Sequence, residues 1–158
     1  MSGLSWLTIL RKRENFRKAF KSFDIEAVAR FNVRSVERLL LDAGIVRHRG
    51  KIESTINNAR RCRDLIDEFG SLRSYAWSYE PDIRSRPQTL DWHSLVELGV
   101  SHEATMMSKD LKRRGWSFVG PTTVYSFMEA VGLVNDHVNA CDLREEVEKQ
   151  RRDFSRPV

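Results

Sequence analysis

Residues 108–132 read SKDLKRRGWSFVGPTTVYSFMEAVG. Apolar side chains at helical spacing occupy both ends of this stretch, and Gly115 and Gly120-Pro121 interrupt it. The pattern predicts two helices joined by a hairpin, because Gly suits a helix end and Pro a first helical turn. A helix that opens at Gly-Pro leaves its first backbone amides unpaired, and such amides can hold a phosphate. An ordinary helix start without a ligand is the simpler interpretation of the same residues.

The rest of the chain favours an all-helical fold. Eight glycines and four prolines among 158 residues leave few turns for a sheet. The clearest further helix carries an apolar stripe from Ile52 to Phe69 and ends at Gly70. Gly44 suits a left-handed residue that ends an earlier helix. Three residues precede other periodic segments as candidate N-caps: Asp24, Asn32 and Ser71.

The organisation of the chain predicts one domain over residues 1–158. Residues 80–90, which include Pro81 and Pro87, read as a loop within that domain. The charged tail at 142–158 reads as helical or frayed, because Glu145 and Lys149 are spaced for an i,i+4 pair. No internal repeat or low-complexity tract is present.

Charge is concentrated in the first part of the chain. Residues 1–63 contain 15 Lys and Arg against 6 Asp and Glu, and Arg60, Arg61 and Arg63 share the polar face of one predicted helix. Such a concentration suggests a polyanionic partner, although solvated helix faces also produce it. No apolar run approaches the length of a membrane helix, and no secretion signal opens the chain. We therefore expect a cytoplasmic protein that does not enter a membrane.

His137 and Cys141 lie four residues apart and would share a face if their segment were helical. This spacing can supply two zinc ligands, whereas a structural zinc site needs four. A buried cysteine beside a surface histidine is the simpler interpretation. With only Cys62 besides Cys141, a disulfide scaffold is excluded.

Trp6 stands ahead of the basic residues Arg11, Lys12 and Arg13. An aromatic ring beside positive charge can stack on a nucleic-acid base, and it favours a cationic ring. A tryptophan at the start of an amphipathic helix is more often a core anchor.

Several segments together resemble the DNA-3-methyladenine glycosylase I family of the helix-hairpin-helix superfamily. They follow the family's order along the chain: Gly3-Leu4-Ser5-Trp6, Lys12-Arg13-Glu14-Asn15, Phe23-Asp24, Asp42 to Ile52, Asn58-Ala59-Arg60, Ser108 to Lys112, Phe118 to Thr123 and Gly132 to His137. The resemblance implies an all-α, helix-hairpin-helix glycosylase-like fold. It also implies an enzyme of base-excision repair that flips 3-methyladenine out of alkylated duplex DNA and hydrolyses its N-glycosidic bond.

The resemblance assigns roles to individual residues. Trp6 matches the tryptophan that stacks on the extruded base, and Leu4 lies in the loop that presses into the gap left in the duplex. His137 and Cys141 match two ligands of a structural zinc ion. The remaining DNA-binding residues are Lys112, Gly120, Pro121, Thr122 and Thr123. We expect a monomer whose partner is double-stranded alkylated DNA.

The resemblance also implies features that this sequence lacks. The family's other zinc ligands, pocket tyrosine and pocket glutamate precede its Gly-Leu-Ser-Trp motif, whereas this chain begins at Met1-Ser2-Gly3. We expect a start codon assigned too late or a truncated remnant, with a zinc half-site that is insensitive to chelators. The alternative is a DNA-binding remnant without catalytic activity. Asn135 replaces the wider superfamily's catalytic aspartate, as is typical of this family.

Overall fold

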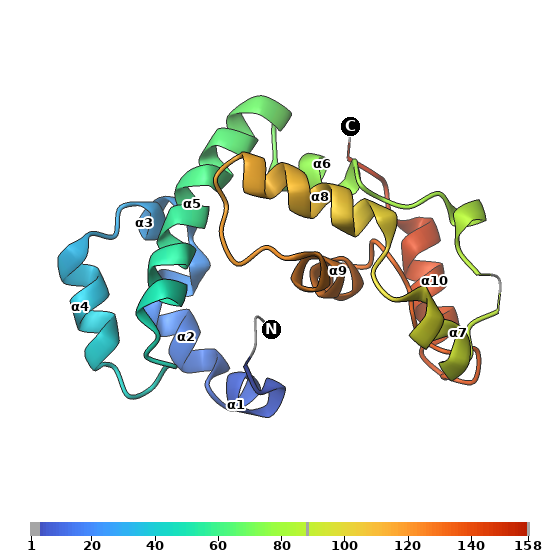
Figure 1. The fold of residues 1–158 in the computed structure, drawn as a ribbon, viewed down its shortest axis with the longest axis horizontal. Coiled ribbons are helices and arrows are strands. Elements are labelled where there is room, and N and C mark those ends of the chain that lie inside the picture. The colour runs from blue at the N-terminus through green and yellow to red at the C-terminus, as the bar shows by residue number, and fades with distance from the viewer. Residues whose placement is uncertain (1–3, 88, 158) are drawn as a thin grey trace. The chain divides into compact units, whose positions relative to one another are not determined.

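The computed structural model describes residues 4–87 and 89–157, and the regular elements in those ranges are all helices (Figure 1). The all-helical prediction is therefore confirmed. The elements are α1 (Trp6–Arg11), α2 (Arg13–Ala19), η1 (Lys21–Phe23), α3 (Ile25–Ala29), α4 (Val33–Leu41), α5 (Arg49–Phe69), α6 (Leu72–Trp77), η2 (Ile83–Ser85), α7 (Trp92–Leu98), α8 (His102–Arg113), α9 (Pro121–Ala130) and α10 (Arg144–Asp153).

The chain forms two compact units. The first unit contains the residues up to Gly70 together with Leu111–Phe118, and the second contains Ser71–Asp110 and the residues from Val119 onward. The prediction of one domain over residues 1–158 concerns the whole chain and stays a prediction. In the described part of the chain, no helix is long and apolar enough to cross a membrane.

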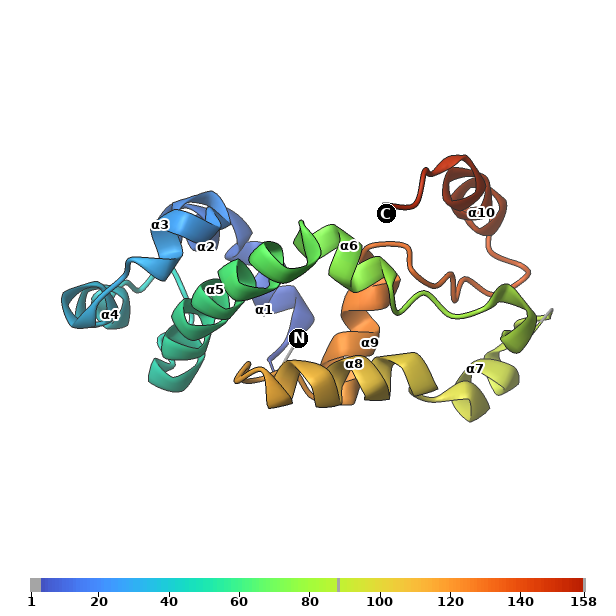
Figure 2. The same cartoon turned by 90° about the horizontal axis from the view of Figure 1, so that it is seen from above.

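The first unit is built around α5, against which α3 and α4 pack (Figure 2). Its core consists of apolar side chains from the helices of this unit and from the segments that connect them: Ala19, Phe20, Val28, Phe31, Val36, Leu39, Ile45, Ile52 and Ile56. Arg60 of α5 donates hydrogen bonds to the carbonyls of Ala29 and Phe31 at 3.0 and 2.9 Å. These bonds satisfy carbonyls at the end of α3, so Arg60 is a structural residue rather than a free cation.

The predicted N-caps are confirmed. The Asp24 carboxylate accepts from the Ala27 amide at 2.7 Å and begins α3. Asn32 accepts from the Ser35 amide and forms a capping box at the start of α4. Ser71 accepts from the Ser74 amide at 2.9 Å at the start of α6. Each cap contributes about 1 kcal/mol to helix stability.

The role predicted for Gly44 is wrong. Helix α4 already ends at Leu41, and Gly44 is not among the glycines with a left-handed backbone. Its amide donates to the Asp42 carboxylate at 2.7 Å. A Cβ at this position would lie 2.8 Å from that carboxylate oxygen and 3.2 Å from the Asn15 side chain. A larger residue here would therefore displace the side chains of Asp42 and Asn15, whereas the backbone conformation itself does not call for glycine.

The second unit has its own buried residues. Met128 of α9 and Leu133 are fully buried, and Tyr75 of α6 is 1 % exposed. The Tyr75 hydroxyl donates to the Asp110 carboxylate at 3.0 Å, and burial, with this bond, raises the pKa of Tyr75 well above its usual range. Helix α7, capped by Asp91, was not predicted from the sequence.

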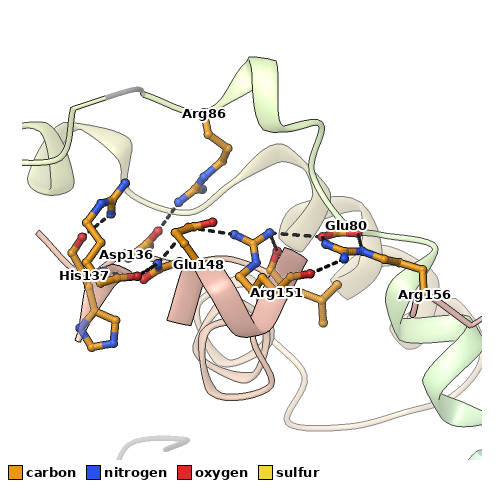
Figure 3. Close-up of polar contacts among 10 residues, drawn as sticks. Glu80, Arg86, Asp136, His137, Glu148, Arg151 and Arg156 are labelled. Carbon is orange, nitrogen blue, oxygen red and sulfur yellow. Dashed lines mark hydrogen bonds and ion pairs between the residues drawn. The ribbon is translucent and has the colours of Figure 1, made fainter. Parts of the chain in front are cut away.

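The charged tail is helical and packs on α6. Phe154, just after α10, stacks on Trp77 with ring centroids 4.4 Å apart. Glu80 accepts from Arg151 at 3.2 Å and from Arg156 at 2.8 Å, as Figure 3 shows. An aromatic contact and shared ion pairs thus hold α10 in the second unit.

Candidate nucleic-acid interface

The start of α9 has the geometry of an anion-binding helix terminus. Gly120 is the N-cap, and no side chain caps the helix. Pro121 has no amide hydrogen, and the first α9 amide with a backbone acceptor in the described chain is that of Val124. The amides of Thr122 and Thr123 are therefore available to a ligand, and the helix dipole favours an anion.

Helix α8 fixes the residue ahead of this turn. Ser108 is fully buried, and its hydroxyl donates to the Val119 carbonyl at 2.6 Å. This bond satisfies the buried Ser108 hydroxyl. It also holds the Val119 backbone, next to Gly120, in place. Ser108 belongs to the motif found in the sequence, and its role in this structure is structural.

The first unit contains a cavity of about 590 Å³, and Leu4 lies in its lining. Trp6 begins α1, is 58 % exposed and is not part of this lining. The interpretation of Trp6 as a core anchor is wrong for this structure, because its ring is mostly in solvent. Gly3, which opens the same motif, lies outside the described residues.

The lining of this cavity is aromatic and cationic. It includes four phenylalanines, namely Phe16, Phe20, Phe23 and Phe118, and three basic side chains, namely Arg13, Arg17 and Lys51. Among the described residues, no carboxylate lines it. The positive charge of this lining suits a phosphate near the cavity. A cationic base would instead be attracted by a carboxylate or by the open face of an aromatic ring.

Lys112 lies at the end of α8, within the first unit, and its side chain is exposed. Among the described residues it forms no ion pair in this structure. Its charge is thus available to a phosphate.

The second unit contains a buried polar cluster that no sequence motif indicated. Tyr125 donates to the Asp136 carboxylate at 2.6 Å, and Arg86 donates to the Tyr125 hydroxyl at 3.0 Å. Arg86 also pairs with Asp136, and both side chains are at most 14 % exposed (Figure 3). Arg86 precedes Asp136 by 50 residues, so no local spacing could reveal the cluster.

The cluster changes the acidity of its members and neighbours. Burial and the bond to Asp136 raise the pKa of Tyr125 to about 12. Burial, with repulsion from Asp136, raises the pKa of the Glu129 carboxyl. Both oxygens of the Asp136 carboxylate are engaged by Arg86 and Tyr125, so this carboxylate is not placed as a free base.

The structure brings His137 and Cys141 together. The cysteine Sγ lies 3.3 Å from the histidine Nδ1. The segment is not helical as the spacing suggested; a turn, in which the Cys141 amide donates to the Val138 carbonyl at 2.9 Å, makes the approach. Thiolate and imidazole ligands of a tetrahedral zinc lie about 3.5 Å apart, so the pair fits two corners of such a site. The described residues contain no group of three or more metal-ligating side chains.

The predicted site residues therefore fall in different units. Leu4, Trp6 and Lys112 belong to the first unit. The turn at Gly120–Thr123 and the pair His137 and Cys141 belong to the second. Their roles in binding DNA, base and metal remain predictions.

Comparison with known proteins shows a family match along most of the chain. The model of the methyladenine glycosylase family matches residues 1–145. The chain is 46 % identical over 141 residues to DNA-3-methyladenine glycosylase 1 of Escherichia coli K12, covering 89 % of this chain and 74 % of that protein. It is 35 % identical to the DNA-3-methyladenine glycosylase of Haemophilus influenzae, covering 89 % and 75 %.

Solved structures show the same similarity. A crystal structure of 3-methyladenine DNA glycosylase I superposes with a TM-score of 0.76 at 42 % identity, covering 89 % of this chain and 76 % of that one. The Staphylococcus aureus enzyme, whose recognition of 3-methyladenine was determined structurally, gives 0.79 at 38 % identity, covering 90 % and 74 %.

Proposed function

The chain belongs to the methyladenine glycosylase family, and on this basis we propose that it is a DNA-3-methyladenine glycosylase of base-excision repair. The observation that carries this proposal is the 46 % identity to the Escherichia coli enzyme over 141 residues. The family match to residues 1–145 includes Trp6, the turn at Gly120 and the pair His137 and Cys141. The fold supports the same activity, because it is similar to the solved structures of two 3-methyladenine DNA glycosylases.

The chemistry demands little general-acid catalysis. An adenine alkylated at N3 carries positive charge and is a good leaving group, so the protein has to bind the duplex, extrude the base and exclude bulk water. Water then replaces the base at the sugar carbon, which leaves an abasic site. The exposed ring of Trp6 is available to stack on the extruded cationic base, where cation–π attraction favours the alkylated form.

The DNA backbone is bound through charge and free amides. The amides of Thr122 and Thr123 are available for a phosphate, and the Lys112 ammonium is exposed to add a second phosphate contact. Leu4 is apolar and half-buried, which suits insertion into the gap left by the flipped nucleotide. These contacts position the duplex without reading its sequence.

His137 and Cys141 would hold a zinc ion at two of its four ligand positions. Such an ion would tie its ligands together and would supply no chemistry to base release.

We also propose that the chain acts as a monomer in the cytoplasm. The substrate of the Escherichia coli relative named above is DNA, and alkylated duplex DNA is the only partner that the proposed reaction requires.

Binding and product formation test this function together. The chain is incubated with methylated and unmethylated duplexes, and Kd and the number of new abasic sites are measured for each. Tighter binding of the methylated duplex with abasic sites formed only there supports a glycosylase. Equal binding of both duplexes without abasic sites would identify a DNA-binding protein without this activity.

A further inference from the structure

The cavity that Leu4 lines lies wholly within the first unit. Its volume is about 590 Å³, and its lining comes from α1, α2, α5 and the segments beside them, together with Ser117 and Phe118. Pockets of about 300–1,000 Å³ with an apolar lining and a few charged groups are typical binding sites for small molecules. The lining of this cavity therefore indicates which kind of molecule would fit.

Two half-exposed phenylalanine rings belong to the lining. Phe23 is 49 % exposed and Phe118 is 47 % exposed. Both residues have a left-handed backbone, with φ of 59° and 56°, which residues other than glycine rarely adopt. Exposed rings on a strained backbone are unfavourable in the free protein, and such strain is concentrated at ligand-binding sites. An apolar ligand that covered the two rings would offset part of this cost.

Positive charge lies at the same cavity. Arg13 and Arg17 of the lining are one turn apart on α2, so they share a face of that helix. Lys51 also belongs to the lining, and its ammonium lies 4.8 Å from the centre of the Phe118 ring. Glu14, outside the lining, pairs with Arg17 at 3.0 Å. Three cations and one carboxylate leave a net charge of +2, which matches the charge of about −2 on a phosphate monoester.

The polar side chains that α5 contributes to the lining are already hydrogen-bonded within the unit. The Thr55 hydroxyl donates to the Lys51 carbonyl at 2.9 Å. The Ser54 hydroxyl and the Asn58 amide donate to the Ser117 carbonyl at 3.2 and 2.9 Å. A nucleobase or a sugar would lose its hydration in this cavity and find few partners in exchange. The lining therefore favours a ligand whose body is apolar.

We propose that this cavity binds a small organic phosphate monoester with an apolar body, of the aryl or alkyl phosphate class. The body covers the rings of Phe23 and Phe118, and the phosphate lies beside Arg13, Arg17 and Lys51. The inference goes beyond the glycosylase activity, because neither DNA nor a methylated base takes part in this binding.

Five probes separate the parts of such a ligand. Naphthyl phosphate contains the apolar body and the phosphate, naphthol the body alone, and inorganic phosphate the head alone. Deoxyadenosine monophosphate carries the same head on a polar body, and naphthylacetate carries a carboxylate on the apolar body. Calorimetry measures Kd for each probe. The amide NMR signals of Phe23, Thr55 and Phe118 show whether a probe binds at the cavity.

Naphthyl phosphate should bind with a Kd of about 0.5 mM or lower and shift all three signals. Naphthol, inorganic phosphate and deoxyadenosine monophosphate should each bind at least about tenfold more weakly, because each lacks the apolar body or the charged head. Naphthylacetate should bind about threefold more weakly than naphthyl phosphate, because it carries less charge.

Two variants and a matched control test the lining itself. Arg13→Gln removes a cation, and Phe118→Leu removes a ring but keeps an apolar side chain. The control, Arg34→Gln, removes an exposed cation of α4 that does not line the cavity. Naphthyl phosphate should bind about tenfold more weakly to Arg13→Gln and about fivefold more weakly to Phe118→Leu. The control should keep the wild-type Kd, and Tm shows that each variant is folded.

Four results would overturn the proposal. The first is no binding of naphthyl phosphate, and the second is equal binding of naphthol, which would mean that the cations are not used. The third is equal binding of deoxyadenosine monophosphate, because the cavity would then not select an apolar body. The fourth is an equal loss of affinity in Arg13→Gln and Arg34→Gln, which would assign the binding to overall charge. Since Arg13 is exposed, its variant keeps the test valid even if Phe118→Leu fails to fold.

Discussion

The side-chain amide of Asn135 donates a hydrogen bond to the Glu148 carboxylate at 2.9 Å, which joins the loop after α9 to α10. The same nitrogen donates to the Arg144 carbonyl at 3.1 Å, and the amide oxygen accepts from the His137 backbone at 3.2 Å. Asn135 is 5 % exposed. Asn135 therefore uses both the donor and the acceptor group of its side chain to hold the fold.

We predict that Asn135→Asp lowers the free energy of unfolding by about 2–4 kcal/mol. The substitution replaces a donor with an anionic oxygen, which then faces the Glu148 carboxylate and the Arg144 carbonyl. Denaturant unfolding of the variant measures this change. Asn139→Asp is the control, because the oxygen that accepts from the Leu90 amide at 3.0 Å is retained. Equal stability of the two variants would contradict the role assigned to Asn135.

The ion pairs of Glu80 predict a defined response to acid. Burial alone would raise the pKa of Glu80, but hydrogen bonds and charge attraction from Arg156 and Arg151 outweigh it and lower the pKa below the usual value. A carboxyl group whose pKa is lower in the folded state stabilises the fold above its unfolded pKa, about 4.3, and loses this effect as pH falls through its folded pKa.

Glu80→Gln should therefore lower the free energy of unfolding by about 1–2 kcal/mol at pH 7. The decrease should be smaller as pH falls below about 4. Thermal unfolding of wild type and variant between pH 7 and pH 3 measures the difference. Glu53→Gln is the control, because its pair with Arg49 is half exposed and should leave Tm unchanged. A constant difference between wild type and Glu80→Gln over this range would argue against the ion pairs as its source.

Chelation should leave this chain nearly unchanged. The described residues bring His137 and Cys141 together but contain no group of three or more metal-ligating side chains, and two ligands bind zinc weakly compared with four. Excess EDTA should therefore shift Tm by less than about 1 °C, and His137→Ala should respond in the same way. A fall of several degrees on chelation, absent in His137→Ala, would show a complete metal site.

Lys112 should contribute to duplex binding through its charge alone. Lys112→Ala is expected to weaken binding of methylated and unmethylated duplexes equally and to reduce the slope of log K against log salt by about 1. Titrations at several salt concentrations measure that slope. Lys149→Ala, which removes an exposed lysine of α10, is the matched control. The same slope change in both variants would mean that overall charge, rather than a phosphate contact at Lys112, is responsible.

Local sequence signals predicted the helices well, because caps act over three or four residues. Asp24, Asn32 and Ser71 each bond to an amide three residues later, which the sequence alone can indicate. Helix α7 was missed because its short exposed segment follows a proline-rich loop and lacks a clear apolar stripe. Gly44 was misinterpreted because its neighbour Asn15 comes from a distant part of the chain.

Sequence could indicate contacts between residues a few positions apart in the candidate site. It could not indicate contacts between residues far apart in the chain. The spacing of His137 and Cys141 indicated their proximity, although a turn rather than a helix produces it. By contrast, the contact between Asn58 and Ser117 joins residues 59 apart, and the pair of Arg86 and Asp136 joins residues 50 apart. Such contacts depend on the packing of whole helices, so no local pattern records them.

Glycosylase activity is tested most directly by the single-turnover rate at which the chain releases free 3-methyladenine from a methylated duplex, with Trp6→Ala measured beside it. We expect release by the wild-type chain and a rate at least about tenfold lower in Trp6→Ala, because a cationic base loses its stacking partner. Duplex affinity should be retained in the variant, since Lys112 and the start of α9 remain. Duplex binding by the wild-type chain without release of the base would contradict the assignment of glycosylase activity to these residues.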